Sequence, residues 1–339
     1  MESDGKHFPI QDFGGFHSAL RKLYSAQNKG ILGKCMYWAE NCSQPPTGSH
    51  SIARSWLERI ADKTNHVIMF EIPVENAGKK PISVTPTRIG INEATKFPGF
   101  CPTHDSKVFS CLENINFTGS QQQLWCLAYR SICREACKKH QVVSFQHEIG
   151  MVKDVPTEHG IRTVIEKCRC VHLLTKKQAL EDMILASKFA LAGYVIELAQ
   201  SPTVLVSATY FPRVTFTGRK LDDRDDWLTL TIMPNKSGGA VVFTWDKQHS
   251  KNVSLLIKSL RSIPPHLQTT CLLDLIFEVS ENFAISPFWW DSLSSVDQTD
   301  TLRRFGHNTT MDKISVPQNL HLRKKVLTDW QPVKWSFVG

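Results

Sequence analysis

Cys101 and His104 are separated by two residues in the segment FPGFCPTHDSKVF (97–109), and their types and spacing suggest metal chemistry. A thiolate and an imidazole at this spacing, just after the turn-forming residues Pro98 and Gly99, can bind one zinc ion. Zinc takes four such ligands, which proteins usually supply as two close pairs. This segment therefore predicts one half of a zinc site.

The second half of the site is predicted upstream, in the segment KCMYWAENCSQ, where six residues separate Cys35 from Cys42. This gap is longer than the usual two to four residues, but a loop such as MYWAEN can bring both sulfur atoms to one metal. In the alternative interpretation, Cys35 and Cys42 are ordinary buried thiols and His104 is a surface residue, because cysteine is often buried without any metal.

Two other groups of cysteine and histidine compete for this role. The first group is Cys133, Cys137 and His140, which lie on one helical face at i, i+4 and i+7. The second group is Cys168, Cys170 and His172, which alternate along the chain. Both groups lie in strongly amphipathic stretches, which favours packing in the core over metal binding.

The order of the residues around the first four candidates resembles a known family. Two cysteines are followed by His-Ser-Ile (50–52), by a separate asparagine and then by Gly-Phe-Cys-x2-His-Asp. Over about residues 30–113 this order resembles the treble-clef zinc domains of HNH endonucleases. The resemblance implies structural zinc on Cys35, Cys42, Cys101 and His104, and a nuclease site formed by His50, Asn92, Asp105 and Arg54.

The resemblance also implies roles for the residues of the nuclease site. His50 takes a proton from the water that attacks a phosphodiester, and Asn92 orients His50. Asp105 helps to hold one Mg²⁺ or Mn²⁺ ion, and Arg54 contacts a phosphate of DNA or RNA.

The chain departs from the HNH pattern at several positions. Ser49 stands directly before His50, where the family has Asp or His, and Asp105 replaces the last metal-binding His. A treble clef that kept its zinc and lost its nuclease chemistry fits these departures equally well. The alternative function is therefore a non-catalytic zinc module that binds a protein or a nucleic acid.

The length of 339 residues predicts roughly two domains. We place an HNH-like zinc domain at residues 1–118 and an α+β domain at 119–339, with helices over 119–200 and antiparallel strands with helices over 201–339. The order of helices followed by strands favours an α+β fold. The remainder of the chain resembles, in architecture only, uncharacterised bacterial proteins thought to serve in phage defence.

Periodicity and turn residues predict the individual elements. We expect helices at 17–27 and at 51–62, where Ser51 can cap, and a loop at 76–94. Long helices follow at about 121–143, 158–173 and 175–198. Strands are expected at 65–72, 203–211, 213–218, 227–234 and 239–246, with residues 234–239 forming a hairpin turn.

Composition limits the partners and the compartment. The net charge of +8 is spread along the chain, which permits a nucleic-acid partner without specifying one. A protein partner or a homo-oligomer is equally compatible. Ten cysteines and an N-terminus without a signal-like apolar run predict a reducing, cytoplasmic location, and no stretch is typical of a membrane span.

Two further segments could carry chemistry. The acidic segment LDDRDDW (221–227) could bind Mg²⁺, although such clusters are more often solvated loops. On a strand, the adjacent Trp289 and Trp290 would point to opposite faces, so one could contact a ligand or partner, although packing between sheet and helices is the favoured interpretation. A site in this half would define a third class of function, an enzyme unrelated to HNH nucleases.

Overall fold

The computed structural model describes residues 31–72, 83–113, 116–150, 157–222, 225–236, 238–309, 327–328 and 330–339. The described chain forms two compact units. The cysteine-rich unit contains the described parts of Met1–Ser49, Phe97–Asp105 and Cys133–Asp182. The sheet unit contains the described parts of His50–Lys96, Ser106–Ile132 and Met183–Gly339.

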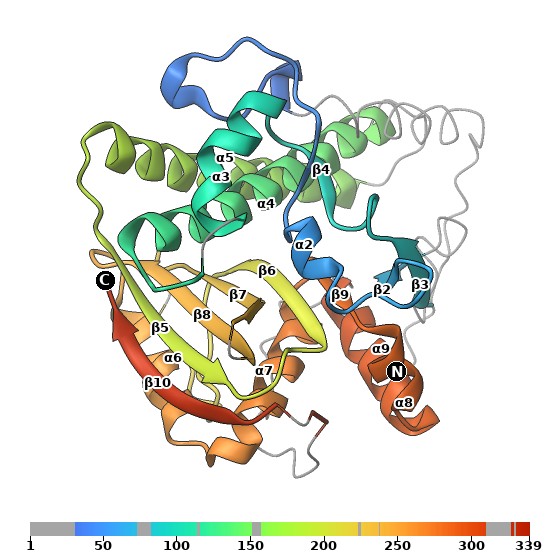
Figure 1. Ribbon diagram of the computed structural model, residues 1–339. Helices are drawn as coiled ribbons and strands as arrows, with labels where there is room; N and C mark the ends of the chain where they lie inside the picture. Colours follow the sequence, from blue (N-terminus) through green and yellow to red (C-terminus); the bar gives the residue numbers. More distant parts are fainter. Residues whose placement is uncertain are drawn as a thin grey trace. The chain divides into compact units, whose positions relative to one another are not determined.

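Figure 1 shows the elements in chain order. The helical elements are η1 (Ile31–Gly33), η2 (Trp38–Glu40), α2 (Arg54–Leu57), α3 (Pro102–Glu113), α4 (Gln121–Gly150), α5 (Thr157–Leu185), α6 (Lys251–Arg261), α7 (Pro265–Val279), α8 (Pro287–Ser292) and α9 (Ser295–Thr309). The strands are β1 (Gly48–His50), β2 (His66–Glu71), β3 (Thr85–Gly90), β4 (Lys96–Pro98), β5 (Leu191–Leu198), β6 (Val204–Tyr210), β7 (Leu228–Asn235), β8 (Gly238–Asp246), β9 (Phe283–Ile285) and β10 (Pro332–Val338). The α+β class is therefore confirmed.

The sheet unit is built on eight strands in the order β10-β5-β8-β7-β6-β9-β2-β3. All neighbouring strands in it are antiparallel, as predicted. The β7–β8 hairpin closes by pairing Asn235 with Gly238, where Gly238 has a positive φ of 147°. A side chain at Gly238 would also clash with the carbonyl oxygen of Leu198, so this turn requires glycine.

Both faces of the inner strands are covered. Apolar side chains of α6 and α7, such as Leu256 and Leu272, pack with Ile196 and Phe243 on one face. On the opposite face, Ser131 of α4 hydrogen-bonds Thr209 of β6, with 3.1 Å between their hydroxyl oxygens. Burial of both faces makes β6, β7 and β8 almost continuously buried. Their sequences therefore lack the alternation of apolar and polar residues that marks a half-exposed strand.

Phe70 on β2 lies at the centre of an aromatic cluster. Its ring meets Phe283, Trp290 and Phe305 edge to face, at centroid distances of 5.3, 5.1 and 5.5 Å. Such edge-to-face pairs add to the gain from burial, because the positive ring edge faces the negative ring face. The cluster joins β2 to β9, α8 and α9, which are distant from it in sequence.

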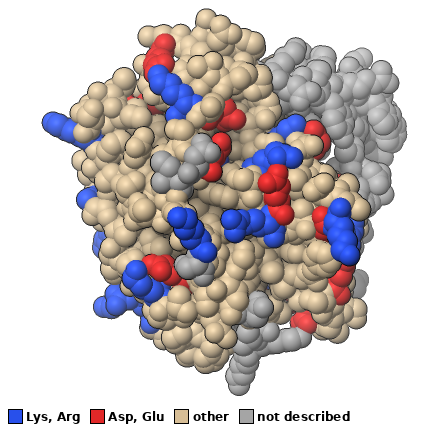
Figure 2. Space-filling model, in the orientation of Figure 1, with Lys and Arg blue, Asp and Glu red and all other residues tan. Residues whose placement is uncertain are grey.

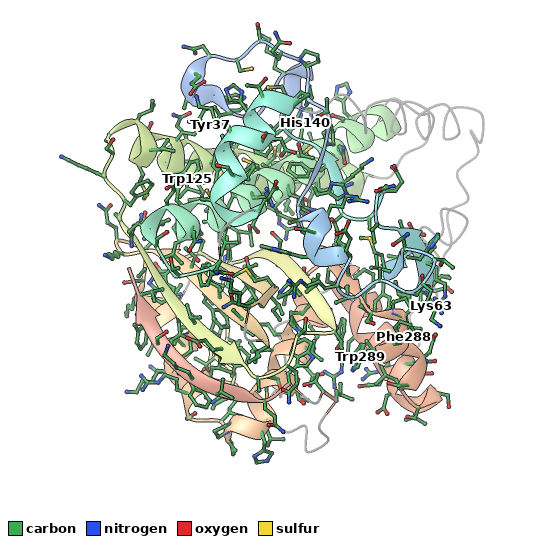
Figure 3. All side chains as sticks on the ribbon, viewed as in Figure 1. Tyr37, Lys63, Trp125, His140, Phe288 and Trp289 are labelled. Atoms are coloured by element: carbon green, nitrogen blue, oxygen red, sulfur yellow. The ribbon has the colours of Figure 1, made fainter. Side chains whose placement is uncertain are left out.

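The tandem tryptophans lie on α8 and not on a strand. Adjacent helical positions are about 100° apart, so Trp289 and Trp290 can both face the core. Trp289 donates its indole N–H to the carbonyl oxygen of Leu327, at 3.1 Å. Phe288, labelled beside Trp289 in Figure 3, is 63% exposed. Packing within the sheet unit therefore accounts for both tryptophans.

The helix predicted at 175–198 is wrong beyond residue 185. The structure has one continuous helix, α5, across the predicted break at 174, followed by strand β5 from Leu191 to Leu198. Gly193 and the run Tyr194-Val195-Ile196 favour a strand. Because β5 is buried on both faces, its apolar run is not distinguished from a buried helix by periodicity.

Three shorter expectations also differ. The helix predicted at 51–62 is reduced to α2 and its flanking turns. Ser51 does not cap it, because Ala53 occupies the N-cap position, while the hydroxyl of Ser51 lies 2.8 Å from Thr95 O and 3.0 Å from Asn282 Oδ1. The loop predicted at 76–94 contains β3, which pairs with β2. The strand predicted at 213–218 is a turn with a single bridge from Val214 to Lys220. The helix predicted at 17–27 lies outside the described residues.

The predicted boundary at residue 118 does not coincide with the two units. β2 and β3, from the first third of the chain, belong to the same sheet as β5–β10, through the pairing of Ile68 with Ile285. The segment Phe97–Asp105 returns to the cysteine-rich unit. Among the described helices, none is long and apolar enough to cross a membrane.

The aromatic cluster generates a stability prediction. Phe70→Ala removes the ring shared by three edge-to-face pairs, and we expect it to lower the free energy of unfolding by about 3–5 kcal/mol. Phe288→Ala is the matched control, and we expect a change within about 0.5 kcal/mol, because the side chain is largely exposed. Urea unfolding of the two variants and the parent measures both values. Equal stabilities for the two variants would contradict the central role of Phe70.

Candidate metal centre

The four predicted zinc ligands come from two separate segments of the cysteine-rich unit. Cys35 follows η1, and Cys42 follows η2, after Asn41 turns the chain with a φ of 51°. Cys101 directly precedes α3, and His104 lies in the first turn of α3. Pro102 begins this helix, where its missing N–H costs no hydrogen bond.

The structure brings the four ligand atoms together. All of them lie within 4.8 Å of one another. His104 Nδ1 is 3.5 Å from Cys35 Sγ and 3.4 Å from Cys101 Sγ, and the Sγ atoms of Cys42 and Cys101 are 3.9 Å apart. Ligands of one tetrahedral zinc ion are about 3.5–3.8 Å apart, given the usual Zn–S and Zn–N bond lengths. The four residues could therefore bind a metal ion such as zinc.

Glu40 positions the imidazole of this cluster. Its Oε2 lies 3.0 Å from Nε2 of His104, on the side of the ring opposite to the thiols. A proton on Nε2 donated to this carboxylate leaves the lone pair of Nδ1 directed at the three sulfur atoms. The ring of Tyr37 packs against His104 with 4.8 Å between centroids; Tyr37 is labelled in Figure 3. Glu40 lies inside the loop between the first two cysteines, and the sequence analysis did not identify it.

Main-chain hydrogen bonds hold the two ligand segments against each other. Met36 N–H donates to Gly99 O at 2.8 Å, and Cys101 N–H donates to Cys35 Sγ at 3.3 Å. Burial raises the pKa of the Cys35 thiol to about 12, although the N–H donors of Cys101 and Tyr37 favour the thiolate. A thiolate at this buried position therefore needs a nearby cation, which a bound metal ion supplies.

A buried ion pair on α5 anchors the loop that carries Cys35 and Cys42. Lys177 and Glu181 lie one helical turn apart, are both fully buried and form a 2.7 Å contact. Glu181 also accepts the backbone N–H of Trp38 at 2.9 Å, and the Lys177 ammonium lies 3.7 Å from the centre of the Trp38 ring. The sequence indicates only two opposite charges at helical spacing, which is typical of solvated helices.

His50, Asn92 and Arg54 all lie in the sheet unit. His50 Nε2 is 3.0 Å from the carbonyl oxygen of Ile91, and Asn92 is the next residue in the chain. Burial lowers the pKa of His50, with a smaller contribution in the same direction from the cations Lys96, Arg130 and Arg54. The Asn92 side chain accepts a hydrogen bond from Arg54 Nε at 2.8 Å.

Asp105 and Ser49 lie in the cysteine-rich unit, as do the zinc-ligand candidates. Asp105 follows His104 in the first turn of α3, and its backbone N–H donates to Cys101 O at 2.9 Å. The hydroxyl of Ser49 accepts the backbone N–H of Phe100 at 3.1 Å. Ser49 therefore contributes a hydrogen bond between the two ligand segments.

The competing groups of cysteine and histidine do not form a second centre among the described residues, where only the cluster above is assembled. Cys133, Cys137 and Cys170 are buried in the core, as the amphipathic pattern predicts, while Cys168 is exposed. In the acidic segment, the carboxylate of Asp226 accepts the backbone N–H of Asn252 at 2.6 Å, and Asp222 pairs with Lys251. These contacts tie the described part of that segment to the start of α6.

The groove that the described residues form in the sheet unit carries charges of both signs. A groove of about 540 Å³ in the sheet unit is lined by both carboxylates and cations, among them Glu58, Glu113, Arg59 and Lys236. On the face drawn in Figure 2, lysine and arginine side chains alternate with carboxylates and do not form one basic patch. Nucleic-acid binding depends on clustered positive charge, which this groove does not have.

Searches of this chain against protein-family models, curated proteins and solved structures find no match.

The buried ion pair gives a prediction for stability. Lys177→Met leaves the Glu181 carboxylate buried without its cation, and we expect a loss of about 3–5 kcal/mol in the free energy of unfolding. Lys177→Met combined with Glu181→Gln removes both charges and should cost less than Lys177→Met alone. The control is Lys251→Met, which breaks an exposed pair and should cost less than about 1 kcal/mol. Chemical denaturation distinguishes these cases, and equal losses for Lys177→Met and Lys251→Met would contradict the anchoring role.

Proposed function

We propose that this chain is a zinc-binding protein whose Cys₃His centre is structural and supports a surface that binds another protein. The observation that carries the proposal is the convergence of four protein ligand atoms within 4.8 Å. Four protein ligands complete a tetrahedron, whereas catalytic zinc sites keep one position open for water or substrate. The centre joins two segments that are about 60 residues apart in the chain.

An exposed apolar stripe in the same unit supports the binding role. Val164, Cys168 and Val171 on α5 are spaced at i, i+4 and i+7, and Val164 and Val171 are 60% and 62% exposed. Adjacent exposed apolar side chains on one helix face are typical of surfaces that contact other proteins. The apolar character of the stripe favours a protein over a nucleic acid as the partner.

Elemental analysis tests the metal centre. We expect about one zinc ion per chain, and we expect Cys101→Ala to reduce zinc content and to lower thermal stability, because structural zinc contributes folding free energy. Cys168→Ala changes an exposed cysteine outside the cluster and should keep both the zinc and the stability. A parent protein that contains no zinc after purification without chelators, and gains none when zinc is added, would refute the proposal.

The position of Glu40 allows a graded test. Glu40→Gln keeps the size of the side chain but removes the charge that orients His104, so we expect zinc affinity to fall by about 10–100-fold. Competition with a chromophoric chelator measures this change. Glu93→Gln, at an exposed carboxylate in the sheet unit, should leave the affinity unchanged.

A divalent-metal-dependent nuclease, such as the HNH resemblance implies, is the second candidate function. The hydrogen-bond geometry of His50 favours it: a proton on Nε2 donated to Ile91 O leaves Nδ1 able to accept a proton from water. The lowered pKa of His50 keeps the imidazole neutral at pH 7. In this function, Arg54, which lies in the same unit as His50, would contact a phosphate of the substrate.

Nuclease activity is tested separately from zinc binding. The second candidate predicts cleavage of DNA or RNA that requires Mg²⁺ or Mn²⁺ and that His50→Ala abolishes while bound zinc is retained. His266→Ala, at an exposed histidine, should retain cleavage. Absence of cleavage of single- and double-stranded DNA and RNA by the zinc-loaded parent would eliminate this candidate and leave the first one intact.

A further inference from the structure

Two cysteines outside the Cys₃His cluster face each other between the helices α3 and α4. Cys111 lies in the last turn of α3, Cys126 lies in the second turn of α4, and their Sγ atoms are 3.1 Å apart. Both belong to the sheet unit, and they are 8% and 1% exposed. A disulfide bond is about 2.05 Å long, so the two sulfur atoms need to approach each other by only about 1 Å.

Contacts on either side of the two thiols hold the end of α3 against α4. The side-chain amide of Gln123 donates to the carbonyl oxygen of Cys111 at 3.2 Å. Arg130 forms a 2.7 Å ion pair with Glu113, and its guanidinium lies 4.1 Å from the centre of the Phe109 ring. Because the two helices are already held together, forming a bond between the sulfur atoms costs little additional conformational entropy.

The surroundings of the two thiols differ, which gives them different chemical roles. The one proton of Cys126 can be donated to Val108 O, at 3.2 Å, or to Sγ of Cys111. Donation to Cys111 lowers the pKa of that thiol, against the opposing effect of burial, and the Arg130 guanidinium also lowers it. The same contact and burial raise the pKa of Cys126. Because the thiolate is the reactive form of cysteine, Cys111 is the nucleophile of the pair.

The nucleophile lies next to residues that line the groove of the sheet unit. Leu112 follows Cys111 in the chain, Gln123 bonds its carbonyl oxygen, and both line this groove of about 540 Å³. Hydrogen peroxide is small and uncharged, and the greater exposure of Cys111 favours attack there over attack at Cys126.

We propose that Cys111 and Cys126 are a peroxide-sensitive dithiol, which is oxidised to an intramolecular disulfide and restored by a thiol reductant. The Cys111 thiolate attacks one oxygen of hydrogen peroxide, the O–O bond breaks and hydroxide leaves, so that Cys111 becomes a sulfenic acid. The Cys126 sulfur then attacks the Cys111 sulfur, and the displaced hydroxide takes up the Cys126 proton and leaves as water. In total, the two thiols lose two electrons and two protons, and peroxide is reduced to two molecules of water.

Peptide mapping of the full chain tests the proposal. One tryptic peptide, residues 108–130, contains both cysteines and none of the Cys₃His ligands, so the result does not depend on the metal centre. The chain is exposed to hydrogen peroxide and unfolded, and the remaining thiols are blocked with N-ethylmaleimide. We expect the peptide to lose both maleimide labels together, to be lighter by two hydrogen atoms than the reduced peptide, and to regain both labels after treatment with dithiothreitol.

Cys137 on α4 is the internal reference in the same digest. Burial raises the pKa of this thiol to about 11, so we expect its peptide to lose the maleimide label at least about tenfold more slowly. Cys137→Ala, which removes this buried thiol, is the matched control variant and should form the disulfide like the parent.

Alanine variants of the pair test the two roles. In Cys126→Ala the sulfenic acid of Cys111 has no partner thiol, so we expect dimedone to label Cys111. In Cys111→Ala we expect Cys126 to keep its maleimide label. Circular dichroism verifies that the variants are folded, and the mapping of the parent stands even where a variant is not.

Several results would overturn the proposal. One is a parent peptide that keeps both labels in excess peroxide, and another is a peptide that loses only one of them. A disulfide from Cys111 to any cysteine other than Cys126 would also contradict it. Dimedone labelling of Cys126 in Cys111→Ala, without labelling of Cys111 in Cys126→Ala, would overturn the assignment of Cys111 as the nucleophile.

Discussion

The cysteine-rich unit depends on four soft side-chain atoms held within 4.8 Å of one another. Two buried thiols, the half-buried thiol of Cys42 and an imidazole gain little from this arrangement alone, because burial disfavours the thiolate form of Cys35. A divalent cation at their centre would instead favour the thiolate forms of the cysteines. The same ligands would then tie the loop around η2 to the first turn of α3. The buried Lys177–Glu181 pair holds the loop from its other side, through Trp38.

The sheet unit is stabilised by the packing of apolar and aromatic side chains. Its inner strands are covered on both faces, and the aromatic cluster around Phe70 attaches β2 to α8 and α9. These contacts place β2 and β3, from the first third of the chain, in the sheet unit.

The two candidate functions make different demands on the Cys₃His cluster. A binding protein needs the cluster only as a fixed support, and the closed set of four ligands with Glu40 behind His104 suits that role. A nuclease needs a second metal ion and an oriented base, and His50 meets the second demand through its contact with Ile91 O. The mixed charges of the surface and of the groove beside α2 support the binding role more directly.

The sequence by itself determined which four residues gather in the Cys₃His cluster, and it determined the α+β class. Pairs of cysteine and histidine close together in the chain, next to turn residues, are local signals, as is the switch to strand-like composition after residue 200. Only the tertiary structure decided that residues 191–198 form a strand, that Trp289 and Trp290 both face the core, and that Glu40 supports His104. Each of these depends on which side chains meet across long sequence distances. Burial on both faces removes the periodicity that would have indicated β5. The carboxylate of Glu40 contacts His104 without belonging to any sequence motif.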